Sequence, residues 1–397
     1  MRQFILVFFM AIVLSIFVDS SSFAGWSYTI LPKDSSWNAL EATTVLGPDL
    51  QGGIAFTPDS GGITNPSYGV IWQSAGYTTL SQVKSKIYDM VSISGEGLYK
   101  VGQSGFGEKA AVWDDSNMPK ILPGQSGTGV SGIANSASYY HDSGDCLIKT
   151  IGGEINQNAT YWINDGTSGW SARTLSPEIS AVNDVKENRL VGFDDNKATK
   201  WVLNENPNVD PAVTTYYMNG NPTATTDAYS QAGSFVGGKG YLNATSHSVA
   251  ILWEDMTGMT ENYNSFMMHP DDGAILSEIY SMDQYHDSGN SVVVSGGWVG
   301  YLSDEPGVYA EINAALWFGL DNDYVNLHIP GYESTVVNDI IVIGDKLYAV
   351  GSATTVNTGP YVCDAVLWTY KIPEPASMTA LIAGFVFLVT RKRRKRG

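Results

Sequence analysis

Cysteine and histidine are scarce in this sequence of 397 residues, which contains two cysteines and five histidines. Two cysteines exclude a scaffold built on disulfides, although export would permit one bridge. Scattered histidines offer no ligand cluster for a zinc site, so we expect no metal of that kind. Whether Cys146 and Cys363, which lie far apart in the chain, form a disulfide stays open.

Basic residues are also few, with 22 Lys and Arg against 40 Asp and Glu and a formal net charge of −18. Six of the bases stand together at positions 391–396, so the rest of the chain is more acidic than this total. Such a surface repels phosphate backbones and anionic lipid. We therefore expect that the protein does not bind nucleic acid. We expect its partner to be a neutral glycan, a cation or a basic surface.

Catalytic motifs are missing as well, because the sequence has no P-loop, Rossmann or Gly-x-Ser-x-Gly element. The stretch YHDSG occurs at 140–144 and 285–289, but adjacent His, Asp and Ser point in different directions, so we interpret both copies as turns. The acidic loops at 271–278 and 321–326 lack the alternating ligands of an EF-hand. We expect no catalytic residue and no cofactor, with calcium as the open alternative.

The first 24 residues have the features of a secretory signal peptide. An uncharged run from Phe4 to Val18 follows Arg2, and small residues precede Ala24. This run is shorter than the ~20 apolar residues that cross a bilayer, which favours a cleaved leader over an anchor. We expect signal peptidase to cut between Ala24 and Gly25.

The last 26 residues, 372–397, contain a short motif, an uncharged apolar segment and a basic cluster in that order. This order resembles a PEP-CTERM sorting tail, whose family is processed by exosortases. The resemblance implies a single transmembrane helix with its bases in the cytoplasm, anchoring in the inner membrane, cleavage, and release to the cell surface or an extracellular polysaccharide matrix. The residues that carry the resemblance are Pro373, Glu374, Pro375, Arg391, Lys392, Arg393 and Arg394.

Between the two ends, residues 25–371 show short β-branched and aromatic runs separated by turn residues, which is typical of an all-β protein. A tetrapeptide of small, apolar, variable and Trp residues recurs at intervals of 39 to 64 residues, the size of a propeller blade. We therefore predict a seven-bladed β-propeller. The tryptophans that end its repeats are Trp72, Trp113, Trp162, Trp201, Trp253, Trp317 and Trp368.

Each repeat shows further strands in a constant order. A strand with a polar residue and a strand ending in Gly precede the Trp strand, and a fourth strand follows it. The last repeat has no room for a fourth strand, but GWSYTILP at 25–32 is similar to GWSARTLSP at 169–177. We therefore expect the mature N-terminal strand to close the ring. The repeat resembles HAF-type repeats of exported bacterial proteins, although the His-Ala-Phe signature itself is absent.

The polar residue of the first strand in each repeat is the main candidate for a site, because one strand per blade lines the axis of a propeller. Such a ring either holds a cation or a neutral sugar, or satisfies backbone donors where blades meet. The tryptophans outside the repeat series, Trp26, Trp37, Trp170 and Trp298, are candidates for exposed contacts. The predicted axial ring consists of Asp89, Asn135, Asp184, Asp227, Ser281 and Asp339.

These features predict a non-enzymatic binding or structural propeller that reaches the envelope or matrix through exosortase. A secreted glycosidase or lyase on the same scaffold is the alternative, since 40 acidic residues leave room for two converging carboxylates.

Overall fold

Every regular element in the described part of the chain is a β-strand, which confirms the predicted all-β class. The computed structural model describes residues 25–57, 67–74, 76–80, 84–105, 108–115, 117–127, 129–204, 209–218, 221, 223–241, 247–256, 263–287, 290–302, 309–320, 322–355 and 362–372. These ranges hold no helix long and apolar enough to cross a membrane. The expected leader at 1–24 and all of the expected tail beyond residue 372 lie outside them.

Four sheets each consist of four antiparallel strands that follow one another along the chain. The first is β6 (Lys86–Ile93), β7 (Gly97–Ser104), β8 (Lys109–Trp113) and β9 (Pro119–Ile121). The second is β10 (Gly132–His141), β11 (Leu147–Ile155), β12 (Asn158–Asn164) and β13 (Ser171–Thr174). The third is β14 (Ser180–Lys186), β15 (Arg189–Asp194), β16 (Lys197–Val202) and β17 (Ala212–Tyr216). The fourth is β18 (Thr226–Ala232), β19 (Phe235–Tyr241), β20 (Ser248–Asp255) and β21 (Tyr263–Met267).

The other twelve strands form one sheet made of three antiparallel groups. One group is β2 (Ala39–Gly47), β3 (Leu50–Phe56), β4 (Ser67–Gln73) and β5 (Gly76–Thr79). The next is β22 (Leu276–Asp287), β23 (Asn290–Leu302), β24 (Tyr309–Phe318) and β25 (Tyr324–Asn326). The last is β26 (Ser334–Ile343), β27 (Lys346–Thr355), β28 (Val362–Lys371) and β1 (Trp26–Ile30). Single parallel bridges, Ile312 to Ser334 and Ala39 to Cys363, join the groups.

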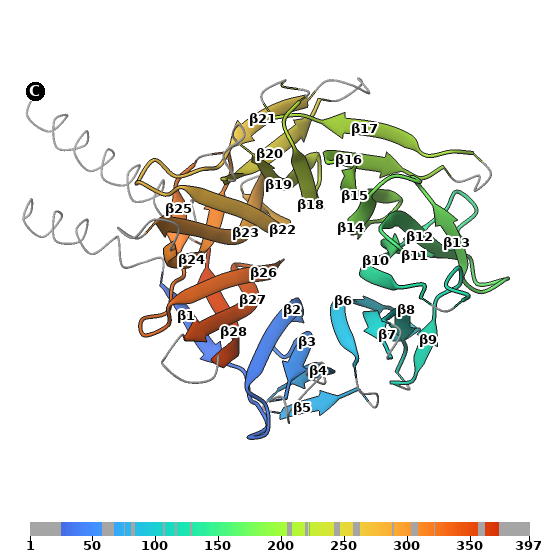
Figure 1. The fold of residues 1–397 in the computed structure, drawn as a ribbon, viewed down its shortest axis with the longest axis horizontal. Coiled ribbons are helices and arrows are strands. Elements are labelled where there is room, and N and C mark those ends of the chain that lie inside the picture. The colour runs from blue at the N-terminus through green and yellow to red at the C-terminus, as the bar shows by residue number, and fades with distance from the viewer. Residues whose placement is uncertain are drawn as a thin grey trace, which may run out of the picture.

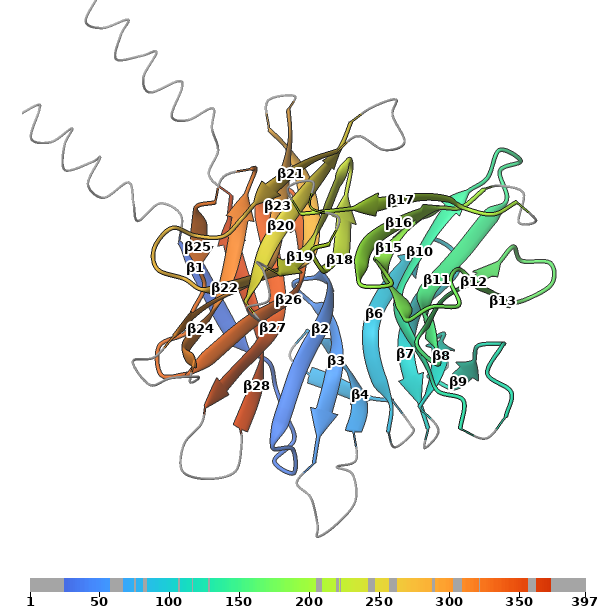
Figure 2. The same cartoon turned by 45° about the horizontal axis from the view of Figure 1, so that its top comes forward.

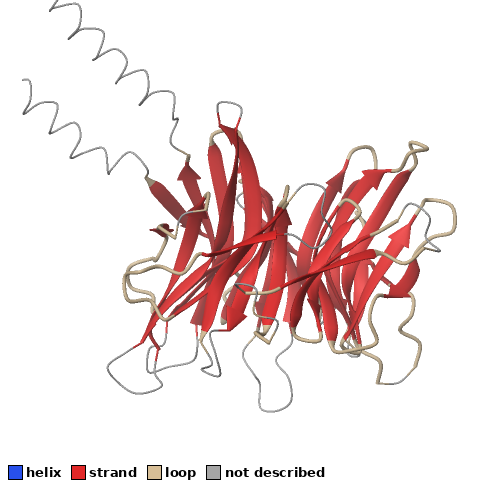
Figure 3. Ribbon diagram, turned by 90° about the horizontal axis from the view of Figure 1, so that it is seen from above, coloured by secondary structure: helices blue, strands red, loops and turns tan. Residues whose placement is uncertain are grey.

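The sheets surround a common axis in a propeller-like arrangement. In Figure 1 the first strand of each group (β2, β6, β10, β14, β18, β22 and β26) lies nearest the centre, and the later strands lie farther out. The sheets stand side by side around the centre when the view is tilted (Figure 2). Seen from the side, the strands run steeply between two ends where the loops gather (Figure 3). The first strand of each group is thus placed to line the axis.

Each first strand carries a β-bulge at the same place in its group, and β2 has a second irregularity between Val45 and Gly47. The extra residue is Thr43, Tyr88, Asn135, Asn183, Tyr229, Tyr280 or Asn338. Opposite each bulge the second strand has a glycine at which an added Cβ would lie 1.9 to 2.0 Å from a backbone carbonyl oxygen of the first strand. A side chain has no space there, which explains the recurring Gly of the second strand. These glycines are Gly53, Gly102, Gly153, Gly192, Gly238, Gly297 and Gly351.

The seven repeat tryptophans form the packing between neighbouring groups, and each is at most 2% exposed. Several indole N–H groups donate across the junction, as Trp162 does to the carbonyl of Pro123 at 2.9 Å and Trp253 to that of Tyr217 at 3.0 Å. The small residue three positions before Trp accepts a hydrogen bond at its carbonyl oxygen from the residue that follows the outer strand. In the first sheet, for example, the N–H of Leu122 donates to the carbonyl of Ala110 at 3.0 Å. The repeated tetrapeptide is therefore a packing motif.

The N-terminal strand β1 takes the outer position of the last group. It pairs antiparallel with β28, with Trp26 opposite Tyr370. Leu31 donates its N–H to the carbonyl of Ala365 at 2.9 Å, and Trp72 donates to the carbonyl of Pro32 at 2.8 Å. These are the same contacts that the outer strands of other groups make, so β1 replaces a fourth strand after β28.

Candidate functional site

An axial cavity is lined by the bulged residues of the first strands and, on every first strand except β2, by the residue after the bulge. Its volume is about 120 Å³, and a second cavity of about 240 Å³ continues along the axis. Both cavities are bordered by one set of short polar side chains, which we call the waist. The waist residues that line both cavities are Asp89, Ser136, Asp184, Ser230, Ser281 and Asp339.

The bulged residues form the wall of the smaller cavity and also tie neighbouring groups together. Asn135 donates to the carbonyl of Val182, and Asn183 donates to that of Ala228, both at 2.8 Å. Asn338 donates to the carbonyl of Ala42 at 3.0 Å, which joins the last group to the first. A bulge aims its extra residue away from the regular strand pattern, so these side chains reach the axis. The resulting wall is made of amide, hydroxyl and phenol groups.

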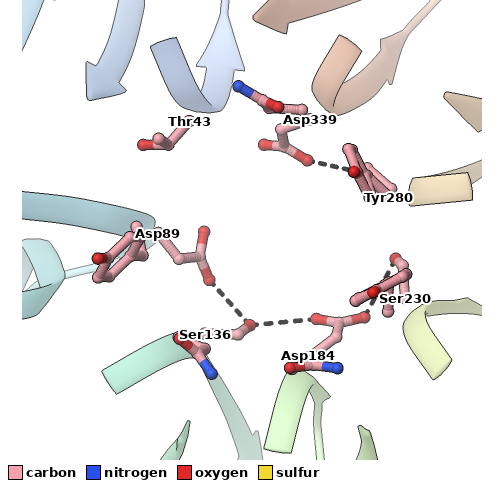
Figure 4. Close-up of a pocket in the computed structure, with 13 residues that line it drawn as sticks. Thr43, Asp89, Ser136, Asp184, Ser230, Tyr280 and Asp339 are labelled. Atoms are coloured by element: carbon pink, nitrogen blue, oxygen red, sulfur yellow. Dashed lines mark hydrogen bonds between the residues drawn. The ribbon is translucent and has the colours of Figure 1, made fainter. Parts of the chain in front are cut away.

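The waist side chains accept backbone N–H groups from the next group along the chain. Asp89 accepts from Ala137 at 2.9 Å, and Asp184 accepts from Gln231 at 2.9 Å. Hydroxyls fill the same role elsewhere, since Ser230 accepts from Met282 at 3.0 Å. Figure 4 shows the carboxyl groups of Asp89, Asp184 and Asp339 pointing toward one another across the axis.

The last and first groups are joined by the same kind of contact at the waist. Asp339 accepts the N–H of Val45 at 2.8 Å and the hydroxyl of Ser281 at 2.7 Å. The waist therefore satisfies backbone donors at the junctions, one of the two roles that the sequence left open for the predicted ring.

Two waist carboxyls have strongly raised pKa values. Burial raises the pKa of Asp89 to about 6, and the nearby Asp184 adds to the effect, against the hydrogen bond from Ala137. Burial also raises the pKa of Asp339 to about 7, together with the charge of Asp89. Desolvation favours the neutral acid, and like charges around one axis favour it further. The waist therefore takes up protons near neutral pH.

A third set of residues lies two positions before each bulge, next along the strand to the residues that wall the smaller cavity, and we call this set the mouth. Its charged members are Glu41, Lys86, Asp227 and Glu278, on four different first strands. Burial raises the pKa of both Glu41 and Asp227.

The most crowded part of this mouth surrounds Lys239. The ammonium nitrogen lies 3.3 Å from Glu278 and 3.9 Å from Asp227. It also lies 5.3 Å from the ring centre of Tyr229 and 5.6 Å from that of Tyr241, within cation–π range. Burial alone would lower the pKa of Lys239, but Tyr229 and Glu278 raise it above its ordinary value. Lys239 is therefore a cation with its charge already compensated.

Aromatic groups continue from this cluster toward the axis. Tyr229 and Tyr280 pack edge to face with ring centres 5.3 Å apart, and the indole N–H of Trp298 donates to the hydroxyl of Tyr280 at 3.0 Å. Burial raises the pKa of Tyr280. The mouth and the adjoining cavity wall together thus combine carboxylates, flat rings and amides.

The structure brings five of the six predicted ring residues to the smaller cavity. Asp89, Asp184, Ser281 and Asp339 occupy the waist, whereas Asn135 occupies the bulge one position earlier. Asp227 does not line the cavity and pairs instead with Lys239 at the mouth. The residue of its strand that holds the waist position is Ser230, three positions later.

Sequence reasoning missed the tyrosines, Asn183, Asn338 and the hydroxyl partners of the ring. A bulge changes the alternation of side chains along a strand, so two adjacent residues of each first strand can face the axis. A search for one polar residue per repeat therefore finds only one member of each pair. The signal was a pair of residues rather than one. Aligned on the bulge, the pairs are Thr43–Thr44, Tyr88–Asp89, Asn135–Ser136, Asn183–Asp184, Tyr229–Ser230, Tyr280–Ser281 and Asn338–Asp339.

Other sequence candidates do not form sites. Among the tryptophans outside the repeat series, Trp37 is buried at 8% exposure and takes the packing role rather than an exposed contact, while Trp26, Trp170 and Trp298 are partly exposed. Cys146 is exposed and Cys363 is buried, and both are free.

The two acidic loops do come together, since Asn322 donates to Asp271 at 3.2 Å. Among the described residues, however, no three His, Cys, Asp or Glu side chains are grouped as a metal site. The first YHDSG copy forms a turn, in which Asp145 donates its N–H to the carbonyl of Asp142.

The fold thus defines an all-β protein with a propeller-like set of four-stranded sheets. No protein-family model matches the chain, and no curated protein matches it significantly. Among solved structures, a Trypanosoma rangeli sialidase in complex with 2,3-difluorosialic acid is similar with 10% identity and a TM-score of 0.43, over 87% of this chain and 59% of the sialidase chain. This chain therefore spans about three fifths of the sialidase's length.

A β-1,2-mannobiose phosphorylase from Listeria innocua, in complex with β-1,2-mannobiose, has 9% identity and a TM-score of 0.30, over 87% of this chain and 91% of that chain. These scores are too low to bear on the activity or ligand of the present protein.

Proposed function

We propose that residues 25–371 form a seven-bladed β-propeller closed by β1. The repeated bulge, the glycine opposite it and the Trp packing support seven equivalent units. Closure is supported by contacts that join the last unit to the first, namely Asp339 to Val45 at 2.8 Å and Asn338 to Ala42 at 3.0 Å. A closed ring leaves no sheet edge unpaired at its ends.

This propeller is an exported binding protein that takes a neutral, polyhydroxylated ligand, a glycan, at the mouth of the axial channel. The observation that carries the proposal is the cavity wall of three tyrosines, three asparagines and a threonine supplied by the bulges. Phenol and amide groups both donate and accept hydrogen bonds, as sugar hydroxyls require, and flat rings cover the apolar faces of a sugar. The waist carboxyls are engaged in junction contacts, which favours binding over catalysis.

Export and release follow the predicted route. Signal peptidase removes residues 1–24, the PEP-CTERM-like tail holds the protein in the inner membrane, and exosortase cleavage near Pro373–Pro375 releases it to the cell surface or matrix. The acidic composition supports this location, because a strongly negative body does not adhere to anionic lipid. The polysaccharide of the matrix is then the available partner.

A carbohydrate-active enzyme is the second candidate, and one contact favours it. Asp227 and Glu278 both approach the Lys239 ammonium, at 3.9 and 3.3 Å, so their carboxylates lie within about 7 Å of each other, compatible with the separations used in glycoside hydrolysis. Against this candidate, Lys239 occupies the space between them, where a substrate would have to lie.

A polysaccharide panel separates the two functions. The purified protein is expected to bind one glycan class saturably without forming product, and Tyr280→Ala is expected to weaken binding at least tenfold. Tyr139→Ala, a change at a partly exposed tyrosine of β10, is the matched control and should bind normally. Product formation that Glu278→Gln abolishes would establish the enzyme instead, and absence of any glycan binding would refute the proposed ligand.

A further inference from the structure

Ser136 lies between two carboxyl groups at the waist (Figure 4). Its Oγ is 3.0 Å from an oxygen of Asp89 and 3.1 Å from an oxygen of Asp184. The same Oγ accepts the backbone N–H of Val185 at 3.2 Å. A serine hydroxyl has one proton and can donate it fully to only one acceptor. The second contact between oxygens therefore needs a proton that the serine does not supply.

The remaining donors around these carboxyls are already committed. Asp89 also receives the hydroxyl of Thr44 at 3.1 Å and the N–H of Met90 at 2.7 Å, besides that of Ala137. None of these protons lies between Asp89 and Ser136 or between Ser136 and Asp184. The missing proton must then belong to one of the two carboxyl groups.

A hydroxyl shared between two ionised carboxylates is the alternative arrangement. It would place two negative charges within about 6 Å, a separation at which the charge of Asp184 disfavours the ionisation of Asp89. The third waist carboxyl, Asp339, feels the same kind of repulsion, since burial and then the charge of Asp89 raise its pKa. Two carboxyls that share one proton avoid this repulsion, as in other closely spaced acid pairs.

We propose that the waist is a proton-binding site in which Asp89 and Asp184 share one proton across Ser136. The bound proton sets the charge at the floor of the smaller cavity and completes the contacts between three neighbouring units. This inference does not depend on the glycan proposal, because it follows from hydrogen bonds within the ring.

The charged groups near the waist do not supply a substitute for this proton. The one base lining the two cavities is Lys186, and its ammonium lies 3.9 Å from Asp283, which compensates its charge. The carboxyl of Asp339 has three donors of its own, from Ser281, Val45 and Ile340. The other titratable groups that line the two cavities are Tyr88, Tyr229, Tyr280 and Asp283.

Stability should depend on this proton in a defined direction. The pKa of Asp89 rises from 3.8 to about 6 on folding, so the folded protein binds more protons than the unfolded chain between these values. Unfolding free energy then falls as pH increases through this window. We expect the melting temperature to decrease between about pH 4 and pH 6, the range that the two pKa values of Asp89 define.

The variant Asp184→Asn tests the shared proton. Its neutral amide donates an N–H to Ser136 in place of the proton, so the pH slope of the melting temperature should fall to half of the wild-type slope or less. Asp283→Asn is the matched control, since Asp283 also lines the channel and accepts a backbone N–H, from Val342 at 2.7 Å, but does not touch Ser136. The control should keep the wild-type slope, and an equal slope in all three proteins would overturn the proposal.

Infrared spectroscopy gives a readout that does not depend on unfolding. In an Asp339→Asn background, we expect the C=O stretch of a protonated carboxyl at about pH 5.5, below the pKa of Asp89, and we expect it to be lost when Asp184→Asn is added. A spectrum without that band at any pH above about 5 would show both carboxyls ionised and would refute the shared proton.

Discussion

The glycine opposite each bulge gives the sharpest test of the repeat, and Gly153 is the best position for it. In Gly153→Ala the new Cβ would lie 1.9 Å from the carbonyl oxygen of Ile133, whereas ordinary contact begins at 3.4 Å. The obstructing atom is backbone, so no side chain can rotate away. The bulge of β10 must move, and that bulge carries Asn135 and precedes Ser136.

The cost of this movement can be bounded. Overpacking a well-packed interior costs about 1–3 kcal/mol, occasionally more, and a backbone clash belongs at the upper end. We therefore expect a loss of about 3 kcal/mol in unfolding free energy. At roughly 2–4 °C per kcal/mol for a domain of this size class, the melting temperature should fall by about 6–12 °C.

Thermal unfolding followed by circular dichroism measures the effect, with Gly76→Ala as the matched control. Gly76 also lies in a strand, β5, but the nearest atom to its added Cβ is 4.0 Å away. The control should melt within about 2 °C of the wild type. If Gly153→Ala melted at the same temperature as the control, the close approach at the bulge would be refuted. The explanation for a glycine opposite the bulge in every group would then fail as well.

Three further changes test other parts of the fold and the route. Deleting residues 25–32 should expose the edge of β28 and cause aggregation or loss of cooperative unfolding, and an unchanged melting curve would remove β1 as the closing strand. Replacing residues 373–375 by alanine should leave unprocessed protein in the membrane fraction, whereas normal release would point to another signal. Trp253→Phe should cost about 1 kcal/mol more than Trp113→Phe, because the first indole donates across the junction and the second has no partner among the described residues. Equal losses in chemical denaturation would contradict that contribution.

The repeat was readable in the sequence because its strongest elements are local. Two residue types recur where one strand must approach another closely: a small residue three positions before Trp, and a glycine in the preceding strand. Close approach leaves no space for a larger side chain, so it restricts the residue type at that position. The four strands per unit and the N-terminal strand at the outer position followed from the same patterns. Leu31, for example, makes the contact to Ala365 that Leu122 makes to Ala110.

The candidate site was only partly readable. Asp89, Asp184, Ser281 and Asp339 were predicted because a polar residue recurs at the same place in the first strand of each repeat. Asp227 was misplaced because its strand has several polar residues, including Ser230 three positions later, and only the bulge decides which one faces the waist.

Composition and local pattern by themselves determined that this protein is an acidic all-β chain of repeated four-stranded units, since strand period, turn residues and tight contacts are encoded in short segments. Which side chains meet at the axis was decided only by tertiary structure. A bulge changes the direction of every side chain that follows it, and the shared position of Asp89, Ser136 and Asp184 arises from three strands about 50 residues apart in the chain.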